Sequence, residues 1–310
     1  MGLLDAIRGL FSTGAKRSEP PAGRLSVAEL ARRLAVSEAE LRAVPLVYRR
    51  FQVPKRTGGH RTIYEPGEEL KRVQRLLLRK LFKRLSAHPR AHGFERGKST
   101  VTGALPHERK RVVLRMDLRD FFGSIKSARV RDYFARAGWD ADAAQLLTRL
   151  CTHEGALPQG APTSPRLSNL VNFRVDARLD ALARKCGADY TRYADDMTFS
   201  LATDEHEPLA QLVRAARKIL GEEGYELNAR KKLQIRRSHH RQTVTGLVVN
   251  ERVALPRATR RWLRAVEHRA AQGRETTLSP AQLEGWRALR NMVEGHSAGS
   301  VNKAGQYPPR

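Results

Sequence analysis

The sequence predicts an α+β fold, because short strand-like segments and amphipathic helices share one chain of 310 residues. Residues 48–64 contain two alternating runs joined by a Thr-Gly-Gly turn, which is typical of a β-hairpin. Residues 111–116 are largely apolar and β-branched, as in a buried strand, whereas residues 68–85 repeat apolar side chains at helical spacing. A chain of this length buries at least one sizeable core and has room for about two or three subdomains.

The other predicted elements follow the same two periodicities. Residues 26–43 predict a small N-terminal helical layer in which Ser37 is an internal helix cap. Residues 166–185 predict one long helix with an apolar inner face. Further strands are predicted at residues 189–192, 197–201 and 243–250, and further helices at residues 138–151, 209–220, 258–271 and 280–293.

The chain carries a large excess of basic residues. Lys and Arg number 58, whereas Asp and Glu number 32, which gives a formal net charge of +26. A charge of this sign and size favours a polyanionic partner, foremost a nucleic acid. A solvated, arginine-rich surface is the alternative that the charge alone leaves open.

Neither a membrane protein nor a disulfide-stabilised secreted protein is indicated. The two cysteines, Cys151 and Cys186, lack the spacing of a zinc site or a disulfide framework. No apolar run of about 18 residues occurs, and the N-terminus lacks the pattern of a secretory signal. We therefore expect a cytoplasmic protein that does not enter a membrane.

Three aspartates lie at the ends of predicted strands. Asp117 follows one strand directly, and Asp195 and Asp196 lie in the turn between two others. In an antiparallel sheet such ends can lie side by side, and hard carboxylate oxygens are ligands that suit Mg²⁺. Phosphoryl transfer to a growing strand requires two cations about 3.5–4 Å apart. We expect these three residues to be catalytic and to bind two Mg²⁺ ions, although an Asp-Asp pair alone is also a common turn former.

Three motifs, in chain order, resemble those of reverse transcriptases. Residues 115–125 are similar to the first metal motif of these enzymes, and residues 193–196 read Tyr-Ala-Asp-Asp, as in the second. Between them, residues 157–165 resemble the loop that contacts template and nucleotide, which implies that Gln159 and Gly160 bind the nucleotide. A Pro- and Gly-rich linker is the alternative for this loop.

The resemblance covers nearly the whole chain after about residue 44. It implies a right-hand polymerase with fingers, a palm containing an antiparallel sheet, and a helical thumb, preceded by a short N-terminal helical extension. The implied boundaries are residues 1–44 for the extension, 45–110 for the fingers, 111–235 for the palm with an interposed fingers or loop segment at 124–165, and 236–310 for the thumb and RNA-recognition region.

The resemblance also implies nucleotide-binding residues. Lys55 and Arg61 lie in a segment similar to the fingers hairpin, which implies contact with the triphosphate, and two flanking cations suit a polyphosphate. Residues 224–228, followed by Lys231, resemble a further motif of the family, which implies that Lys231 lies near the departing pyrophosphate. Phe122 falls where the family places a ring under the incoming sugar, and such a ring excludes a ribose 2′-hydroxyl. Core packing for Phe122 and solvent exposure for the cations are the alternatives.

Two features resemble the retron branch of the family. Val244-Thr245-Gly246 matches a triplet that is associated with recognition of the retron's own structured RNA. Residues 103–107 resemble the Asn-Ala-x-x-His signature, with Gly103 in place of the asparagine, whereas His107 taken alone would be interpreted as a surface histidine. The resemblance implies an enzyme that copies part of a partner noncoding RNA into linked single-stranded DNA (msDNA) and that acts in antiphage defence.

The basic C-terminal region suits nucleic-acid binding. Arg260, Arg261 and Arg264 surround Trp262, so that cations for phosphates lie beside a ring for stacking. We expect these residues, together with His107 and the Val-Thr-Gly triplet, to bind RNA or DNA. The expected partners are the cognate structured noncoding RNA, its DNA product, deoxynucleoside triphosphates and an effector protein encoded nearby.

Two alternatives remain open at this stage. An intron-encoded or diversity-generating reverse transcriptase would share the palm, but its terminal regions would differ. An RNA-binding scaffold without activity would need only the charge, although all three aspartates and both hairpin cations are present in this chain.

Overall fold

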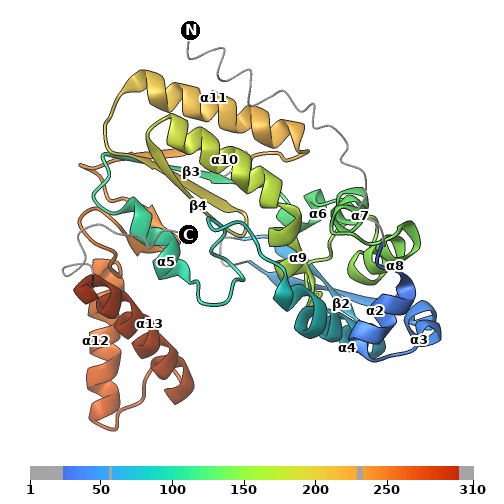
Figure 1. Cartoon of the computed structure of the whole chain (residues 1–310). Helices are drawn as coiled ribbons and strands as arrows, with labels where there is room; N and C mark the ends of the chain where they lie inside the picture. Colours follow the sequence, from blue (N-terminus) through green and yellow to red (C-terminus); the bar gives the residue numbers. More distant parts are fainter. Residues whose placement is uncertain (1–23, 56–57, 229–232, 300–310) are drawn as a thin grey trace. The chain divides into compact units, whose positions relative to one another are not determined.

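The structure is a computed structural model that describes residues 24–55, 58–228 and 233–299 (Figure 1). The chain folds into two compact units, each assembled from three separate stretches. Unit 1 comprises Met1–His88, Asp120–Arg178 and Ile219–Tyr225, and unit 2 comprises Pro89–Arg119, Leu179–Lys218 and Glu226–Arg310. The mixture of helices and antiparallel strands confirms the predicted α+β class.

Two short helices begin the described part of unit 1. They are α2 (Val27–Leu34) and α3 (Glu38–Ala43). Ser37 caps α3 through a capping box, in which Ser37 and Glu40 each accept a hydrogen bond from the other's backbone N–H. Their inner faces are buried at Leu30, Leu34 and Leu41. The predicted helical layer and its internal cap are confirmed, whereas residues 1–23 of the expected extension lie outside the described residues.

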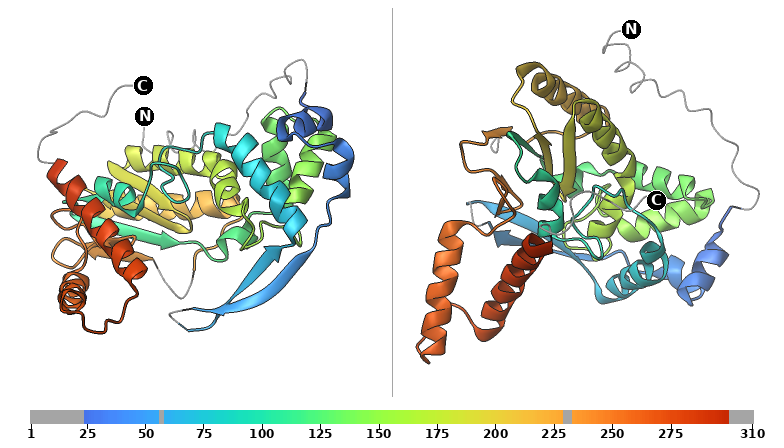
Figure 2. Two further views of the ribbon diagram at one scale, coloured as in Figure 1. Left: turned by 90° about the horizontal axis from the view of Figure 1, so that it is seen from below. Right: turned by 60° about the vertical axis from the view of Figure 1, so that its left-hand side comes forward.

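The predicted hairpin is present in unit 1 as the antiparallel pair β1 (Tyr48–Pro54) and β2 (His60–Pro66). At its base the Tyr48 ring stacks on His153, with ring centroids 4.2 Å apart. The backbone N–H of Tyr64 donates to the carbonyl of Gln159 at 2.8 Å, which fastens β2 to the loop after α8 (Ala141–Cys151). The hairpin extends away from the helices that hold its base (Figure 2), and every residue of β1 after Tyr48 is exposed.

Helices form the remainder of unit 1. They are α4 (Glu68–Leu76), α6 (Phe121–Ser124), α7 (Ser127–Arg136), α8 (Ala141–Cys151) and α9 (Ser164–Val171). Helix α4 continues through a π-helical turn (Leu77–Leu81) and a 3₁₀ turn (Phe82–Arg84), which confirms the helix predicted over residues 68–85. Phe82 and Phe134 are fully buried and stack with centroids 6.0 Å apart in the core of this unit.

The single long helix predicted over residues 166–185 is wrong, because the chain forms two helices there. Helix α9 ends at Val171 and α10 (Phe173–Lys185) begins after Asn172. Asparagine is a poor helix former, and tertiary contacts stabilise Asn172 at this break. Its amide oxygen accepts hydrogen bonds from the Tyr225 hydroxyl at 2.7 Å and from Arg129 at 3.1 Å.

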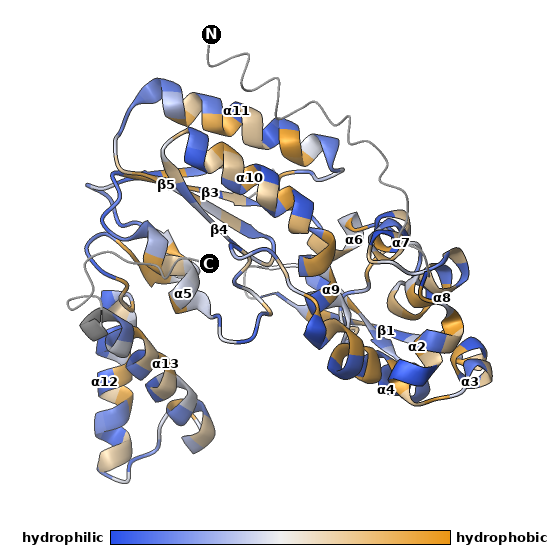
Figure 3. Ribbon diagram, in the orientation of Figure 1, coloured by the Kyte–Doolittle hydropathy of each residue, from blue (hydrophilic) through white to orange (hydrophobic). Residues whose placement is uncertain are grey.

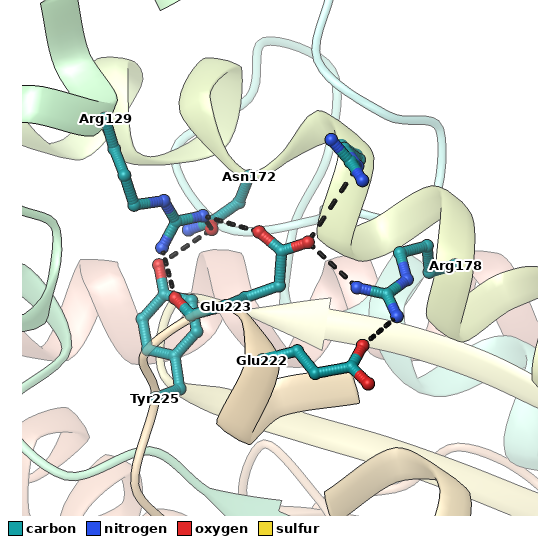
Figure 4. Close-up of polar contacts among 7 residues, drawn as sticks. Arg129, Asn172, Arg178, Glu222, Glu223 and Tyr225 are labelled. Atoms are coloured by element: carbon teal, nitrogen blue, oxygen red, sulfur yellow. Dashed lines mark hydrogen bonds and ion pairs between the residues drawn. The ribbon is translucent and has the colours of Figure 1, made fainter. Parts of the chain in front are cut away.

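A network of ion pairs fastens the stretch Ile219–Tyr225 to the rest of unit 1 (Figure 4). Glu223 accepts a hydrogen bond from Arg178 at 2.9 Å, and Arg178 also pairs with Glu222. Arg129 donates to the backbone carbonyl of Glu223 and lies 5.0 Å above the Tyr225 ring. The Arg178 and Glu223 side chains are only 12% and 16% exposed, so this pair is less screened by solvent than a surface pair.

The core of unit 2 is a four-stranded antiparallel sheet. Its strands are β3 (Val112–Asp117), β4 (Ala188–Tyr193), β5 (Asp196–Leu201) and β6 (Gln234–Arg237), in the order β4-β5-β3-β6. Val112, Val113 and Leu114 are buried, as expected for an inner strand with neighbours on both sides. The unit 2 parts of α10 and α11 (His206–Glu222) lie on one side of this sheet (Figure 1) and carry both hydrophobic and hydrophilic residues (Figure 3).

Two smaller clusters complete unit 2. Helix α5 (Thr100–Ala104) packs with the short hairpin β7 (Thr243–Val244) and β8 (Leu247–Val248) around a buried apolar cluster that includes Val101, Val113 and Val244. Helices α12 (Arg257–Ala271) and α13 (Pro280–Gly299) share a cluster of Leu263, Val266 and Leu283. None of the helices in the described part of the chain combines the length and apolar character needed to cross a bilayer.

Gly160→Ala should destabilise the attachment of the hairpin. A Cβ atom at Gly160 would lie 2.7 Å from the Ile63 side chain and 2.8 Å from the Tyr64 carbonyl, and the backbone there has φ +122°. We expect a loss of at least about 1–3 kcal/mol in the free energy of unfolding, measured by urea denaturation. Gly155→Ala is the control, because Gly155 also has positive φ but has open space around it. Equal losses in the two variants would contradict this close-packing argument.

Candidate active site

The register of two strands in unit 2 brings the three aspartates together. Asp117 at the end of β3 is the Cα partner of Asp196 at the start of β5. Ala194 and Asp195 form the two-residue turn between β4 and β5, and the backbone N–H of Leu118 donates to the Asp195 carbonyl at 3.0 Å. The convergence expected from the strand ends is therefore present in the fold.

All three aspartates line one pocket of about 360 Å³. The other residues that line this pocket come from several elements of unit 2: Thr100, Arg115, Tyr193, Gln234 and Thr245. Thr245 belongs to the Val-Thr-Gly triplet, and its hydroxyl donates to the Thr100 carbonyl at 3.1 Å. The triplet thus contributes a wall to the pocket that holds the acids.

Two side chains hold the carboxylates in place. Arg115 lies two residues before Asp117 on β3 and forms an ion pair with Asp196 through Nη2, while its Nε lies 3.3 Å from Oδ1. Asn228 donates its side-chain amide to Asp117 Oδ1 at 2.9 Å and its backbone N–H to the Asp117 carbonyl at 2.8 Å. Charged and amide partners of this kind restrict the rotamers of both acids.

The donor chemistry of the pocket fits a hard divalent cation, because three carboxylates converge at one edge of a sheet. In this structure two of the carboxylates bind other side chains of the protein instead, because Asp196 pairs with Arg115 and Asp117 accepts a hydrogen bond from Asn228. Within the described ranges, no group of three or more His, Cys, Asp or Glu side chains is arranged to hold a metal ion. A cation at this site would therefore compete with Arg115 for the Asp196 carboxylate.

The turn formed by Ala194 and Asp195, the aspartate turn, is held in place by Arg192 and by the segment that contains Arg90, His92 and Gly93. The backbone N–H of His92 donates to the Arg192 carbonyl at 2.8 Å, and the Arg192 N–H donates to the Arg90 carbonyl at 2.9 Å. The Arg192 side chain is 1% exposed and donates to the Ala194 carbonyl at 3.1 Å. Gly93 lies so close that a Cβ atom there would be 2.9 Å from the Ala194 nitrogen. These contacts restrain the turn before any ligand binds.

His107 is fully buried, which corrects both the surface interpretation and the expected contact with RNA. Its Nε2 lies 2.7 Å from the Thr191 hydroxyl on β4 and its Nδ1 lies 2.7 Å from the Ser200 hydroxyl on β5. Thr191 gives its own proton to the Gly103 carbonyl at 3.0 Å. His107 Nε2 must therefore carry a proton, and Nδ1 accepts one from Ser200. His107 thus links β4 and β5, the two strands on either side of the aspartate turn, by hydrogen bonds, and we call it a buried neutral strut.

The expected nucleotide-binding residues with described positions lie in unit 1. Lys55 and Arg61 are exposed on the hairpin, where Arg61 opposes Val53 and the Lys55 N–H donates to the Gly59 carbonyl at 2.9 Å. Neither cation makes an ion pair within the described residues. Gln159 and Gly160 lie against β2 through the contacts described above. Lys231 lies outside the described residues.

The two phenylalanines after Asp117 differ in their surroundings. Phe121 is buried in the core and packs near the Tyr225 ring, with centroids 6.3 Å apart. Phe122 is half-buried, and its ring centroid lies 5.3 Å from that of Phe121. Part of the Phe122 ring is therefore accessible to solvent at the surface of unit 1.

The expected RNA-binding residues of unit 2 form two groups. Arg260, Arg261 and Arg264 are exposed on α12 and make no ion pair in the described part of the chain, while Trp262 is 37% exposed. The Trp262 ring packs edge-on against Trp286, with centroids 5.3 Å apart. In the triplet, the Val244 side chain is fully buried, whereas Thr245 and Gly246 form the turn between β7 and β8.

Two residues of the site were not assigned a role from the sequence. The sequence could have predicted that Arg115 lies near the acids, because side chains alternate along a strand and Arg115 is on the same side as Asp117. Asn228 belongs to the motif that precedes Lys231, but only the structure shows that it binds Asp117.

Comparison with known proteins places these observations in a family. Residues 53–249 match the family model described as "Reverse transcriptase (RNA-dependent DNA polymerase)". The chain is 40% identical to the retron Mx65 reverse transcriptase of Myxococcus xanthus over 269 residues, which cover 81% of this chain and 62% of the relative. It is 36% identical to the retron Mx162 reverse transcriptase of the same organism, over 80% of this chain and 58% of the relative. It is 34% identical to the retron Ec86 reverse transcriptase of Escherichia coli, over 89% of this chain and 83% of the relative.

The matched regions thus span somewhat less than two thirds of the length of the two Myxococcus relatives, at 62% and 58%. The match to the Escherichia coli relative is more complete, at 83% of its length. The family model includes all three aspartates, because Asp117, Asp195 and Asp196 lie within residues 53–249.

The burial of His107 makes stability depend on pH. Burial, followed by the nearby cations, lowers the pKa of His107 from 6.5 to about 3, so the folded state holds it neutral while the unfolded state protonates it below about 6.5. The stability that this residue contributes is complete above pH 6.5 and is lost as the pH falls toward 3. His107→Gln keeps a donor and an acceptor but removes the titration.

We therefore expect the wild type to lose stability relative to His107→Gln as the pH falls from 6 to 4.5. The difference between their free energies of unfolding should change by about 1.4 kcal/mol per pH unit. Urea denaturation at a series of pH values measures this difference, and the comparison cancels the titration of other groups such as His92, whose pKa burial lowers to about 4. A difference that does not change with pH would show that His107 is not a buried neutral strut.

Proposed function

This chain belongs to the reverse transcriptase family and to its retron branch, and on that premise we propose that it is an RNA-directed DNA polymerase. The proposal rests above all on one observation, the register that places Asp117 opposite Asp196 beside the Asp195 turn. Three carboxylates at adjoining strand ends suit the chemistry of nucleotidyl transfer. The net charge of +26 suits a polyanionic template.

We assign Asp117, Asp195 and Asp196 as the catalytic residues that bind two Mg²⁺ ions. When bound, such a pair of cations activates the attacking 3′-hydroxyl or 2′-hydroxyl and stabilises the leaving oxygen of the triphosphate. Asn228 orients the Asp117 carboxylate by its side-chain hydrogen bond. Arg115 holds Asp196 in an ion pair and partly offsets the negative charge of the acids.

The incoming deoxynucleoside triphosphate is assigned to residues of unit 1 and to Lys231. Lys55 and Arg61 are exposed cations on a hairpin, suited to the triphosphate. Gln159 and Gly160 lie in a loop that contacts β2, and Phe122 offers a half-buried ring to the sugar. Lys231 is assigned to the departing pyrophosphate. In this proposal the chain is a right-hand polymerase with an N-terminal extension at residues 1–44, fingers at 45–110 and a palm at 111–235 that contains an interposed fingers or loop segment at 124–165. Residues 236–310 are the thumb and RNA-recognition region.

The template is proposed to be a cognate structured noncoding RNA, copied in part into linked single-stranded DNA (msDNA). The exposed arginines of α12 and Trp262 suit the phosphates and bases of this RNA and its DNA product. Thr245 and Gly246 of the triplet offer a turn at the rim of the acid pocket. We also propose a role in antiphage defence together with a neighbouring effector protein, as the resemblance to retron enzymes implies.

Asp195→Asn should abolish DNA synthesis without loss of RNA binding. The substitution keeps the shape of the side chain but removes the charge that a cation requires, so we expect incorporation of deoxynucleotides on an RNA template to fall by at least about 1,000-fold. Primer extension with Mg²⁺ measures this rate. Asp204→Asn is the matched control, because Asp204 pairs with Arg237 at 2.7 Å and does not line the acid pocket. Undiminished synthesis by Asp195→Asn would refute the catalytic assignment.

Phe122→Ala should relax the selection of the sugar. Removal of the ring opens space for a 2′-hydroxyl, so we expect the preference for deoxynucleotides, measured as a ratio of kcat/KM values, to fall by about 10- to 100-fold. Phe122→Tyr keeps the bulk of the ring and should keep the preference. Rejection of ribonucleotides that is the same in Phe122→Ala and wild type would remove Phe122 from this role.

A further inference from the structure

We propose that Phe94 is a stacking residue for an unpaired nucleobase, placed beside the aspartate turn in unit 2. Phe94 lies on the loop between Pro89 and Ser99, and its ring has no role in the site described above. Its side chain is 44% exposed, although a phenyl ring gains most when it is fully buried. An exposed ring on a positively charged protein is available to the face of a base.

The backbone at Phe94 is strained, because its φ is +62°, in the left-handed region. Bulky side chains rarely adopt this conformation, and such strain persists mainly where function requires it. Two other non-glycine residues with positive φ, Ala194 and Thr245, belong to the aspartate turn and to the wall of the pocket. Three of the four described non-glycine residues of unit 2 that have positive φ therefore lie in or beside the candidate active site, whereas the fourth, Arg109, does not line the pocket.

The loop that carries Phe94 is held firmly. Lys98 donates its ammonium group to the carbonyls of Pro89 and of Ala91, the latter at 3.0 Å, and so closes the loop across its base. His92 is hydrogen-bonded to the Arg192 carbonyl, and Gly93 packs against the Ala194 nitrogen. Phe94 therefore follows two residues that are fixed to the aspartate turn, so its ring is positioned before a ligand arrives.

The surroundings of the ring indicate the class of ligand. The Phe94 centroid lies 6.4 Å from that of Tyr193, which lines the acid pocket. Arg96, two residues further, is exposed and suits a phosphate of the same strand. Aromatic rings beside cations are the usual means of binding single-stranded nucleic acid without reading its sequence. The ligand class is therefore an unpaired nucleotide of RNA or DNA at the edge of the active site.

This inference rests on the proposed polymerase function, and binding measurements separate the two. The full-length protein is titrated into a labelled oligouridylate, into the corresponding oligothymidylate and into an abasic strand of the same length, with fluorescence anisotropy as the readout. Phe94→Gly removes the ring and suits the left-handed backbone. We expect it to weaken binding of the base-containing strands by about 5- to 150-fold and to leave binding of the abasic strand unchanged.

Two controls accompany this variant. Phe94→Tyr keeps the aromatic face and should retain wild-type affinity. Phe173→Ala removes another exposed phenyl ring, which is 45% exposed, and should not change the affinity. The midpoint of thermal unfolding of Phe94→Gly should stay close to that of the wild type, because relief of the positive φ offsets the larger conformational entropy of glycine in the unfolded chain.

A loss confined to the ribose or to the deoxyribose strand would identify the strand that the ring contacts, and would support the inference. Wild-type affinity in Phe94→Gly, or an equal loss on the abasic strand, would overturn it. If the wild type synthesises DNA and one of these results is obtained, only the stacking role fails. If the wild type neither binds these strands nor synthesises DNA, the polymerase proposal fails together with it.

Discussion

The antiparallel register of β3 and β5 is the constraint on which the candidate active site depends. Side chains alternate along a strand, so a shift of one residue would turn Asp117 away from Asp196 and place its neighbours at the edge of the sheet. Burial specifies the register, because residues 112–114 of β3 and residues 197–201 of β5 are all buried in this pairing. The apolar interior of unit 2 therefore determines where its most polar site is formed.

Buried polar groups add precision that apolar packing alone does not provide. His107 joins β4 to β5 through two hydroxyl groups, and Arg192 holds the turn between those strands through the Ala194 carbonyl. A buried polar group costs free energy unless it is hydrogen-bonded, so these residues favour a single arrangement of the strands. Arg115 and Asn228 act in the same way on the acids themselves. The carboxylates are thus held by a scaffold with few alternative conformations.

The elements with strong local signals were predicted from the sequence, and the long-range polar contacts were not. The hairpin of β1 and β2, the strand that ends at Asp117 and the capped N-terminal helices follow from periodicity and from local turn and cap signals. The burial of His107 has no such signal, because its partners Thr191 and Ser200 lie 84 and 93 residues away along the chain. The helix break at Asn172 was missed for the same reason, since the apolar repeat continues across it while Tyr225 is 53 residues distant.

The interleaved course of the chain has a consequence for biosynthesis. Unit 1 contains Ile219–Tyr225, which the network around Glu223 fastens to α7 and α10, so a nascent polypeptide cannot complete this unit until residue 225 has left the ribosome. By then two of the three stretches of unit 2 have also been synthesised. Synthesis of the two units therefore overlaps during translation, and no contiguous fragment of the gene encodes either of them alone.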